Sequence, residues 1–475
     1  MPKREACGVV GAISKGTDVA GAIYYGLIAL QHRGQESAGM SVLDSSGIHI
    51  HKGMGLAGDV FVWEIISSMK GSLGIGHVRY STTGLSSSAN SQPFAVEDPR
   101  SGIVLGHNGN LVNYVELRKK LERSGRRLSS TCDAEVILQM ISKEVGKDGD
   151  IFNGIKRCMD AFEGAYSVVC HTGEGELVAF RDPLGFRPLC FGSNGGMRML
   201  GSESVALDIN GIPFVRDVEP GEVMVLRDDG LESKLVKPCR RRGHCMFEYV
   251  YFSRPDSVVN GRSVYDARVE LGRNLAKLDG ARADIVVPVP DTARPAAAGY
   301  AEESGIPAVE GLIKNRYIFR TFIMPWQTAR DRAVELKINP MRSVIGNKRV
   351  VLVDDSIVRG TTTKRIVRMV KKAGAKEVHV RITCAPIIGP CFYGIDMSTH
   401  AELIAANHPV DEIARIIGAD SLVYNTIDGI VDSIGLSRGD LCLACLTGEY
   451  LTSRAQEMSE KMRGRKRRYW EIEAT

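Results

Sequence analysis

The sequence predicts a chain of more than one domain, and its second half has the pattern of an α/β fold. At 475 residues the chain is too long for one ordinary domain, and its length suggests about two or three. Residues 350–353 form a short apolar run rich in β-branched side chains, which is typical of a strand buried on both faces. A polar loop and a helical pattern follow, and open α/β sheets bind ligands at the carboxyl ends of their strands.

The loop after this strand has the composition of a phosphate site. Asp354 and Asp355 end the strand, and the following residues 356–363, SIVRGTTT, supply hydroxyl groups and a glycine. Hydroxyls and backbone N–H groups at a helix N-terminus hold phosphate, whereas two adjacent carboxylates suit sugar hydroxyls or Mg²⁺. The alternative is that the two aspartates only end the strand and cap the next helix.

The string RVVLVDDSIVRGTTT, residues 349–363, resembles the phosphoribosyl diphosphate (PRPP) signature of the type I phosphoribosyltransferases. In that family the acidic pair holds the ribose hydroxyls and the loop holds the 5-phosphate. The resemblance implies a PRPP-binding set that comprises Asp354, Asp355, Ser356, Arg359, Gly360, Thr361 and Thr362. The signature does not identify one reaction, because regulatory proteins that bind PRPP without catalysis keep it.

The composition argues against several other classes. Hydrophobic residues make up 44% and charged residues 25%, as in soluble globular proteins, and the net charge of +5 gives no reason to expect a nucleic-acid partner. The basic tail at 461–468 is interpreted as a solvated helix end, with an anionic partner as the alternative. No apolar run approaches the ~18 residues of a membrane helix, and MPKREA lacks the apolar core of a secretory signal. We therefore expect a cytoplasmic protein that binds no membrane.

Cys7 opens the run CGVVGAI, residues 7–13, which predicts an early strand. The eleven cysteines are scattered and odd in number, so they do not indicate a disulfide framework. A cysteine at a strand start is more often a core residue than a nucleophile. If residues 1–6 are removed, however, the thiol and the new α-amine belong to one residue, and an amine with a pKa near ~7.7 can activate the nucleophile. That arrangement defines the N-terminal nucleophile hydrolases.

Four polar stretches, three of which contain glycine, support a catalytic role for this cysteine. They span residues 31–39, 76–84, 106–110 and 131–135. Arg79 suits a bidentate grip on an α-carboxylate, and Asp133 suits the α-ammonium of an amino acid. Asn108 and the N–H of Gly109 provide the two neutral donors of an oxyanion hole. Each stretch alone could be a turn or a solvated loop.

Together with Cys7, these stretches resemble the class II glutamine amidotransferases, in which an N-terminal cysteine attacks the glutamine amide and releases ammonia through a thioester. The resemblance runs to about Pro238 and includes RDPLGFRP at 181–188. It implies a propeptide at residues 1–6 and an αββα N-terminal-nucleophile glutaminase domain at 7–238. The resemblance assigns the nucleophile, the glutamine ligands and the oxyanion donors to Cys7, to Arg79 and Asp133, and to Asn108 and Gly109. His32 and His77 are interpreted as core or positioning residues.

The second half adds further candidate ligands of PRPP. A linker is expected at 237–244, a β-rich aromatic segment from residue 245, and a helix near 265–277. The run DIVVPVPDT, residues 284–292, predicts a strand that ends in a polar turn, and in phosphoribosyltransferases this turn contacts pyrophosphate. Thr292, followed by Ala293, stands where amidotransferase relatives carry a hydroxyl residue, often Ser, at the metal. We assign it to Mg²⁺ together with Asp354 and Asp355.

A basic segment from Lys314 to Lys337 is either a solvated surface or a flap that closes over pyrophosphate and excludes water. We assign Lys314 and Arg316 within it to substrate binding.

Cys442 and Cys445 form a Cys-x-x-Cys pair, and a tetrahedral zinc site or an Fe–S cluster needs two more ligands. Spacing alone does not choose among the candidates Cys239, Cys245, Cys384 and Cys391. The chain resembles the amidophosphoribosyltransferase family, which unites both resemblances above and has a cluster-containing branch with cysteines in similar strings. That resemblance implies a structural [4Fe–4S] cluster held by Cys245, Cys391, Cys442 and Cys445.

The resemblance to this family covers residues 7 to about 455. It implies a fold of α+β and α/β parts, with a type I phosphoribosyltransferase domain at 245–410 and a helical segment at 411–475. It also implies that glutamine-derived ammonia displaces pyrophosphate from PRPP to give 5-phosphoribosylamine for purine synthesis, with purine nucleotides as inhibitors and a homotetrameric assembly.

Two alternatives remain at this point. The first is a class II amidotransferase that makes an amino sugar or an amino acid amide, against which the PRPP loop argues. The second is a non-enzymatic PRPP sensor, against which the set of amide-hydrolysis residues argues.

Overall fold

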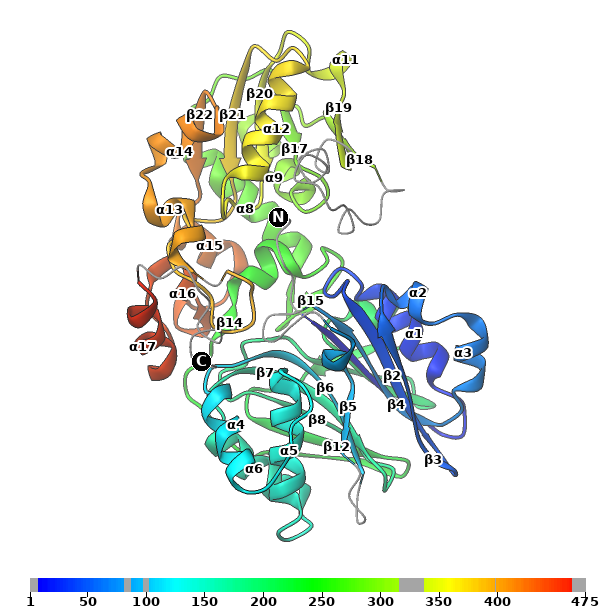
Figure 1. The fold of residues 1–475 in the computed structure, drawn as a ribbon. Helices are drawn as coiled ribbons and strands as arrows, with labels where there is room; N and C mark the ends of the chain where they lie inside the picture. The colour runs from blue at the N-terminus through cyan, green and yellow to red at the C-terminus, as the bar shows by residue number, and fades with distance from the viewer. Residues whose placement is uncertain (1–6, 81–86, 97–101, 316–336, 398, 464–475) are drawn as a thin grey trace.

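The computed structural model describes residues 7–80, 87–96, 102–315, 337–397 and 399–463, and these residues form two domains joined by a connecting segment at residues 236–263 (Figure 1). The first domain contains two antiparallel sheets that pack face to face. The second contains a parallel sheet with helices on its faces. None of the helices in the described residues is long and apolar enough to cross a membrane.

The first sheet of the N-terminal domain has seven strands in the order β11-β9-β10-β1-β4-β2-β3. Its strands are β1 Gly8–Ser14, β2 Ser37–Asp44, β3 Gly47–Met54, β4 Leu73–Arg79, β9 Cys190–Ser193, β10 Met197–Gly201 and β11 Phe214–Asp217. Its outer face is covered by α1 Ala20–Ala29, α2 Ala57–Val60, α3 Trp63–Ser68 and α7 Val205–Asp208. The predicted early strand is therefore confirmed as the central strand β1.

The second sheet has six strands in the order β13-β12-β8-β7-β6-β5. Its strands are β5 Phe94–Val96, β6 Ile103–Leu111, β7 Gly164–Thr172, β8 Leu177–Arg181, β12 Glu222–Arg227 and β13 Gly230–Leu235. Its outer face is covered by α4 Tyr114–Arg123, α5 Asp133–Val145 and α6 Ile151–Ala161, and the short helix η1 spans Ser88–Asn90. The domain thus has the four-layer αββα order implied by the resemblance.

Alternation along β1 shows how the sequence makes both layers. Val10 and Ala12 pack against α1, whereas Val9 and Ile13 pack against the second sheet. Successive side chains of a strand point to opposite faces, so a strand buried on both sides must be apolar throughout. All seven residues of β1 are buried.

The C-terminal domain is built on a four-stranded parallel sheet with the order β17-β20-β21-β22. The strands are β17 Ile285–Pro288, β20 Arg349–Asp354, β21 Glu377–Ile382 and β22 Ser421–Tyr424. The sheet packs on one side against α8 Val264–Lys277 and α9 Arg294–Ser304, and on the other against α12 Thr361–Lys372 and α14 Val410–Ile417. A hairpin of β18 Leu312–Lys314 and β19 Ile338–Pro340 and the short helix α11 Arg342–Ile345 precede β20.

The predicted strand at 350–353 and the helix after it are confirmed as β20 and α12. Ile366, Val367 and Val370 are buried, and the basic residues between them are on the outer side of the helix. The helix begins at Thr361, so the last hydroxyl residues of the loop form its first turn.

Two sequence-based boundaries differ from the structure. The predicted domain end at residue 410 is wrong, because β22 at 421–424 pairs with β21 in the same sheet. The aromatic segment from residue 245 is not β-rich, since only β14 His244–Cys245 is extended and a π-helical turn, η2 Glu248–Phe252, follows it. Aromatic and β-branched residues favour strands, but here Tyr249, Val250 and Phe252 are buried in the core cluster of the second domain, and packing overrides propensity.

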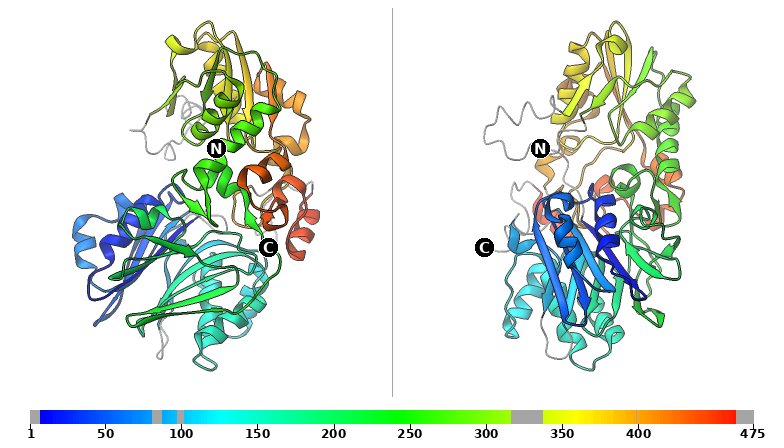
Figure 2. Two further views of the ribbon diagram at one scale, coloured as in Figure 1. Left: turned by 180° about the vertical axis from the view of Figure 1, so that it is seen from behind. Right: turned by 90° about the vertical axis from the view of Figure 1, so that its right-hand side faces the viewer.

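The connecting segment and the C-terminal segment lie between the domains (Figure 2). Parallel strands β14 and β23 Leu441–Cys442 pair with each other, and β15 Val258–Val259 pairs with β16 Arg262–Ser263. The remaining elements are η3 His400–Glu402, α13 Ile404–Asn407, α15 Ile427–Ile434, η4 Arg438–Asp440, α16 Ala444–Thr447 and α17 Ser453–Met462. Most of the basic tail lies outside the described residues.

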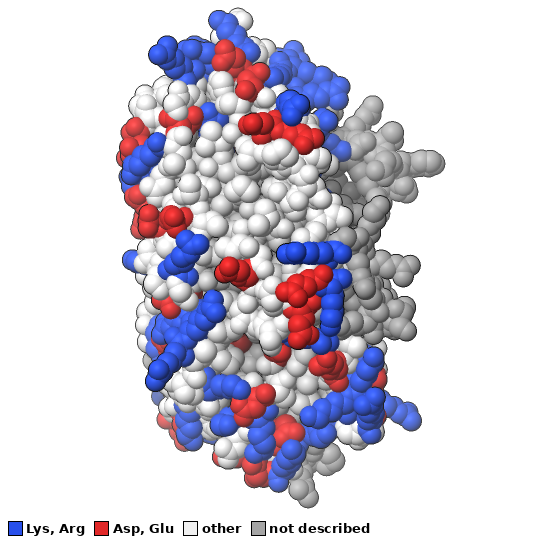
Figure 3. Space-filling model, turned by 90° about the vertical axis from the view of Figure 1, so that its left-hand side faces the viewer, with Lys and Arg blue, Asp and Glu red and all other residues white. Residues whose placement is uncertain are grey.

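On the face drawn in Figure 3, basic and acidic side chains mix around a largely uncharged centre. This face gives no support to a nucleic-acid interface, which would require clustered Lys and Arg.

Helices α8 and α9 cross so closely that glycine is needed on both. A Cβ at Gly272 would lie 1.8 Å from the carbonyl oxygen of Ala296, and a Cβ at Gly299 would lie 2.0 Å from that of Val269. We predict that Gly272→Ala lowers the free energy of unfolding by about 1–3 kcal/mol, because the helices must separate. Urea denaturation measures this loss. Gly21→Ala on α1 is the matched control, since its Cβ would meet no atom within 4 Å; equal effects of the two substitutions would contradict the prediction.

Candidate functional site

Cys7 lies at the start of β1, between β4 and β10. Its side chain is buried, and Sγ donates a hydrogen bond to the carbonyl oxygen of Tyr80 at 3.3 Å. Burial raises the pKa of the thiol to about 11, although the guanidinium of Arg79 acts in the opposite direction. A neutral thiol is a weak nucleophile, so this cysteine needs a base that takes its proton.

Two buried charges of opposite sign flank the thiol. Arg79 ends β4 and Asp133 begins α5, and both act electrostatically on Cys7. Asp133 Oδ2 accepts a hydrogen bond from the N–H of Leu111 at 3.0 Å, and Arg79 Nη1 is 3.5 Å from Glu36 Oε2. A fixed cation and a fixed anion beside one nucleophile suit the carboxylate and ammonium groups of an α-amino acid.

Strand β6 carries the two residues assigned to the oxyanion hole. Gly109 has φ +149°, and a Cβ there would lie 2.0 Å from the carbonyl oxygen of Ala165, so only glycine fits. The side chain of Asn108 is fully buried, and neither its oxygen nor its nitrogen has a hydrogen-bond partner among the described residues. Buried amides are normally paired within the protein, so this one has the arrangement of a ligand-binding group.

His107 and His77 are also buried at this site. His77 Nε2 is 3.0 Å from the carbonyl oxygen of His107, and His107 Nδ1 is 3.8 Å from Asp133 Oδ1. Burial lowers the pKa of both rings, to about 3 for His77, so that both are neutral. A ring with so low a pKa is a poor proton acceptor. The approach of His107 to Asp133 was not predicted, because nothing in the spacing links these residues.

We predict that Asn108→Ala lowers kcat for glutamine hydrolysis by about 10²–10³, as loss of one oxyanion donor does. The KM for glutamine should change little, because the amide would act on charge that develops only in the transition state. Steady-state glutamate release measures both constants. A rise in KM with unchanged kcat would assign Asn108 to ground-state binding instead.

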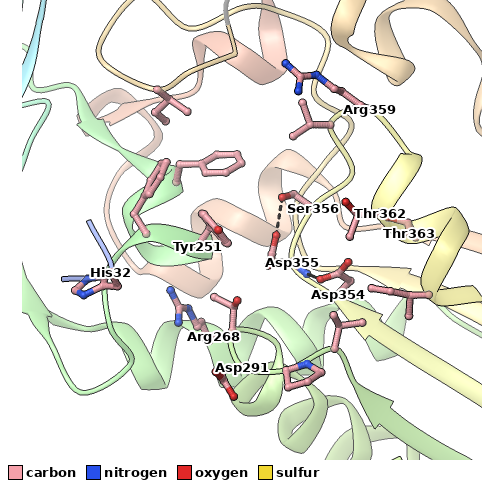
Figure 4. Close-up of a pocket in the computed structure, with 18 of the residues that line it drawn as sticks. His32, Tyr251, Arg268, Asp291, Asp354, Asp355, Ser356, Arg359, Thr362 and Thr363 are labelled. Carbon is pink, nitrogen blue, oxygen red and sulfur yellow. Dashed lines mark hydrogen bonds between the residues drawn. The ribbon is translucent and has the colours of Figure 1, made fainter. Parts of the chain in front are cut away.

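The second site is a cavity of about 510 Å³ at the carboxyl ends of β17 and β20 (Figure 4). Its walls include every described residue that was assigned to PRPP and Mg²⁺. These are Asp354, Asp355, Ser356, Arg359, Gly360, Thr361, Thr362, Thr292 and Lys314. Arg316 and most of the predicted flap lie outside the described residues.

The loop after β20 is stabilised by local hydrogen bonds. The N–H of Asp355 donates to Asp354 Oδ1 at 2.9 Å, and the Ser356 hydroxyl donates to Asp355 Oδ1 at 2.6 Å. Gly360 has φ +73° and precedes α12, where a left-handed residue turns the chain into the helix. The backbone N–H groups of the first turn of α12 therefore border the cavity, as a phosphate site requires.

Asp291 and Lys314 also line the cavity. Lys314 Nζ is 2.7 Å from Asp291 Oδ2, and Arg294 Nη1 is 3.1 Å from Asp291 Oδ1. Asp291 directly precedes Thr292, but its side chain was not among the predicted ligands. No group of three or more His, Cys, Asp and Glu side chains is placed to hold a metal within the part of the chain that the structure describes. Mg²⁺ is commonly held by one or two carboxylates plus substrate phosphates, so this finding is compatible with a substrate-borne Mg²⁺.

Residues from other parts of the chain complete the cavity wall. Phe247, Tyr251 and Phe252 come from the connecting segment, and Arg268 comes from α8 (Figure 4). His32 belongs to the N-terminal domain. These residues were missed as ligands because sequence spacing does not indicate which segments meet between two domains.

Comparisons with known proteins agree with both halves of this description. Residues 77–208 match the family described as a glutamine amidotransferase domain, and residues 263–390 match the phosphoribosyl transferase domain. The chain is 50% identical to the amidophosphoribosyltransferase of Methanothermobacter thermautotrophicus over 96% of its own length and 97% of the relative's. The chain belongs to the amidophosphoribosyltransferase family.

A solved structure of the same family agrees in fold. The glutamine PRPP amidotransferase from Bacillus subtilis, complexed with ADP and GMP, superposes with a TM-score of 0.88 at 44% identity, covering 95% of this chain and 98% of that one. These relatives favour the amidophosphoribosyltransferase reaction over the two alternatives drawn from the sequence.

The four cysteines assigned by family resemblance lie near one another on three segments, although no three side chains among the described residues are placed as a metal-binding group. Cys245 and Cys442 are register partners in the β14–β23 pair, and the N–H of Gly389 donates to the carbonyl oxygen of Cys445 at 3.0 Å. Each of the four thiols has its pKa raised, first by burial, and Cys445 is affected by the other three. Cys384 also acts on Cys445, so the structure places a fifth thiol next to the set. Cys239 is exposed.

Proposed function

We propose that this chain transfers the amide nitrogen of glutamine to PRPP and forms 5-phosphoribosylamine, glutamate and pyrophosphate, the first committed step of purine synthesis. One structural observation supports the proposal in addition to family membership. The cavity beside Asp354 and Asp355 is lined mainly by residues of the second domain and the connecting segment, and His32 of the N-terminal domain completes its wall. The acceptor site therefore lies on the boundary with the domain that contains Cys7.

In the first half-reaction the Cys7 sulfur attacks the side-chain carbonyl of glutamine. Removal of residues 1–6 frees the α-amine of Cys7, which takes the thiol proton and later gives it to the departing ammonia. Asn108 and the N–H of Gly109 stabilise the oxyanion, while Arg79 and Asp133 hold the α-carboxylate and α-ammonium. Water then cleaves the thioester and releases glutamate.

In the second half-reaction ammonia attacks C1 of PRPP, its C1–O bond to pyrophosphate breaks, and the new ammonium loses a proton. Asp354 and Asp355 orient the ribose hydroxyls, and the first turn of α12 holds the 5-phosphate. Thr292 and the two aspartates would hold Mg²⁺ together with PRPP, and the ion would neutralise charge on the departing pyrophosphate. Apolar side chains such as Phe247 and Phe252 keep water from the reacting centre.

The decisive experiment measures glutamate release by anaerobically purified protein, with and without PRPP and Mg²⁺. Strong stimulation by PRPP, with one pyrophosphate released for each glutamate, supports both sites and their coupling. Hydrolysis that is indifferent to PRPP would point to a different acceptor. Absence of hydrolysis, in protein whose mass shows Cys7 as the N-terminal residue, would favour a regulator.

We predict that Cys7→Ala abolishes glutamine-dependent synthesis and leaves ammonia-dependent synthesis intact, because the two reactions use different sites. Pyrophosphate release with glutamine or with ammonium chloride at alkaline pH measures the two activities. If a folded Cys7→Ala protein lost both, the assignment of separate sites would be wrong.

We also propose that Cys245, Cys391, Cys442 and Cys445 hold a [4Fe–4S] cluster with a structural role. The chemistry of the donor set supports this. Cys442 and Cys445 are buried and Cys245 and Cys391 are half-buried, the other three thiols act on Cys445, and the buried guanidinium of Arg187 acts on Cys245 and Cys391. Fe–S clusters are bound by four thiolates, and a nearby cation offsets their negative charge.

We predict that Cys445→Ser removes the iron and the visible absorption of anaerobically purified protein, whereas Cys384→Ser keeps both. Cys384 is the matched control because it is equally buried and acts on Cys445. Iron analysis and visible absorption spectra of the two variants test this prediction. Loss of iron in Cys384→Ser, with retention in Cys391→Ser, would show that the family correspondence chose the wrong ligand.

Regulation and assembly are also proposed by family analogy. The Bacillus subtilis relative was solved with ADP and GMP, and we propose purine nucleotides as feedback inhibitors of this chain. We further propose that the protein is a homotetramer and lies in the cytoplasm. Light scattering of the purified protein tests the assembly.

A further inference from the structure

Arg33 is a fully buried arginine that joins the two domains. It belongs to the N-terminal domain, where its Nε donates to Glu203. Its Nη2 donates to Glu248 Oε2 and, at 3.1 Å, to the hydroxyl of Ser253, both in the connecting segment. A charge buried to this degree moves only together with its partners, because separation would leave it unpaired in a medium of low polarity.

Glu248 is the first residue of the turn η2, and both of its carboxylate oxygens accept hydrogen bonds. Arg187 Nη1 donates to its Oε1 at 3.0 Å, and the Ser253 hydroxyl donates to its Oε2 at 2.8 Å. The side chain of Glu248 is 1% exposed. Movement of η2 therefore moves the carboxylate that holds Arg33.

Arg268 ties the same turn to the PRPP cavity. Its Nε donates to the carbonyl oxygen of Tyr249 at 2.8 Å and its Nη2 to that of Ser253 at 2.7 Å, one near each end of η2. Arg268 lines the cavity, and Asp355 is the carboxylate that acts most strongly on its charge (Figure 4). A ligand that engages Asp355 changes the electrostatic environment of Arg268 and thereby of the turn.

The backbone of Arg33 is linked to the glutamine site through the next residues, 34–36. A Cβ at Gly34 would lie 2.4 Å from the carbonyl carbon of Val78, so this loop is pressed against the end of β4. The N–H of Glu36 donates to the carbonyl oxygen of Arg79 at 3.0 Å, and the carboxylate of Glu36 lies 3.5 Å from Arg79 Nη1. Displacement of Arg33 is therefore transmitted to Arg79.

We propose that the buried Arg33–Glu248 ion pair is the interdomain coupling element through which ligand binding at Asp355 repositions Arg79 for glutamine. Packed and ion-paired groups transmit small shifts because a close-packed interior does not absorb them. The inference deepens the proposed function and rests on it. Neither residue touches a substrate, so both act as positioning residues.

The test compares glutaminase activity with and without PRPP and Mg²⁺ in wild type and Glu248→Gln. The amide keeps the shape of Glu248 and removes its charge. We expect PRPP stimulation to fall about tenfold, within the usual range of coupling energies, mainly through a higher KM for glutamine with PRPP bound. Basal hydrolysis and ammonia-dependent synthesis should be unchanged, because both sites keep their ligands. Stimulation equal to that of wild type would overturn the proposal.

The matched control is Glu302→Gln, which removes an equivalent charge from an exposed pair with Arg273 on the surface of the second domain. It should leave stimulation intact, and an equal loss in this variant would overturn the proposal. The wild-type measurement separates the two levels of inference. If PRPP does not stimulate wild type, the proposed function fails before any variant is considered.

Loss of a buried charge can prevent folding, so a second variant keeps the proposal open to refutation. Arg33→Met together with Glu248→Met replaces the pair by apolar groups of similar length, a change that folded proteins often tolerate. A folded double variant without PRPP stimulation supports the proposal, and one that is still stimulated overturns it. A structural role alone would move the unfolding midpoint without altering the ratio of stimulated to basal KM.

Discussion

The arrangement of the two domains depends on a small set of buried ion pairs between them. Removing charges from water costs several kcal/mol per ion, and this cost is offset only when each charge has several well-placed partners. Glu203 meets that condition, since it accepts from Arg33, His32, Ser257 and the N–H of Arg254. Burial alone would raise its pKa, but Arg33 and His32 hold the pKa well below the ordinary value. Such a network keeps every charge paired only while the segments that carry these residues move together.

The two sites use opposite electrostatic conditions. Around Cys7, burial favours the neutral forms of the thiol and of both histidines, which suits chemistry on an uncharged amide. The cavity near Asp355 instead gathers charged groups, such as Lys314 and Asp291, for a ligand that carries phosphates. Ammonia is nucleophilic only without its extra proton, so its transfer would benefit from the apolar side chains of Phe247 and Phe252 in the cavity wall. The first site nevertheless contains fixed charges as well, since Arg79 and Asp133 act on Cys7.

Local sequence signals predicted the central elements of both folds. The apolar run at 350–353 and the amphipathic pattern after Thr361 depend on side-chain periodicity, which a single sequence records directly. The family resemblance assigned Asp354, Thr292 and Lys314 to the PRPP and Mg²⁺ site, and all three line one cavity. Contacts between distant segments could not be predicted in this way. Arg33 and Glu248 are separated by 215 positions, and no periodicity or propensity relates them. The same limitation concealed β22, a four-residue strand that is recognisable only by its pairing with β21.

The pairing of β14 with β23 has a consequence for how the protein is made. His244 lies opposite Leu441, and Cys245 lies opposite Cys442, although nearly the whole second domain separates them in the chain. The last described helix, α17, also returns to the first domain, where the N–H of Arg454 donates to Glu163 Oε1 at 2.8 Å. A ribosome therefore releases the first domain long before the residues of α17 that contact it exist. Any group held by Cys245 and Cys442 together can be inserted only after synthesis is nearly complete.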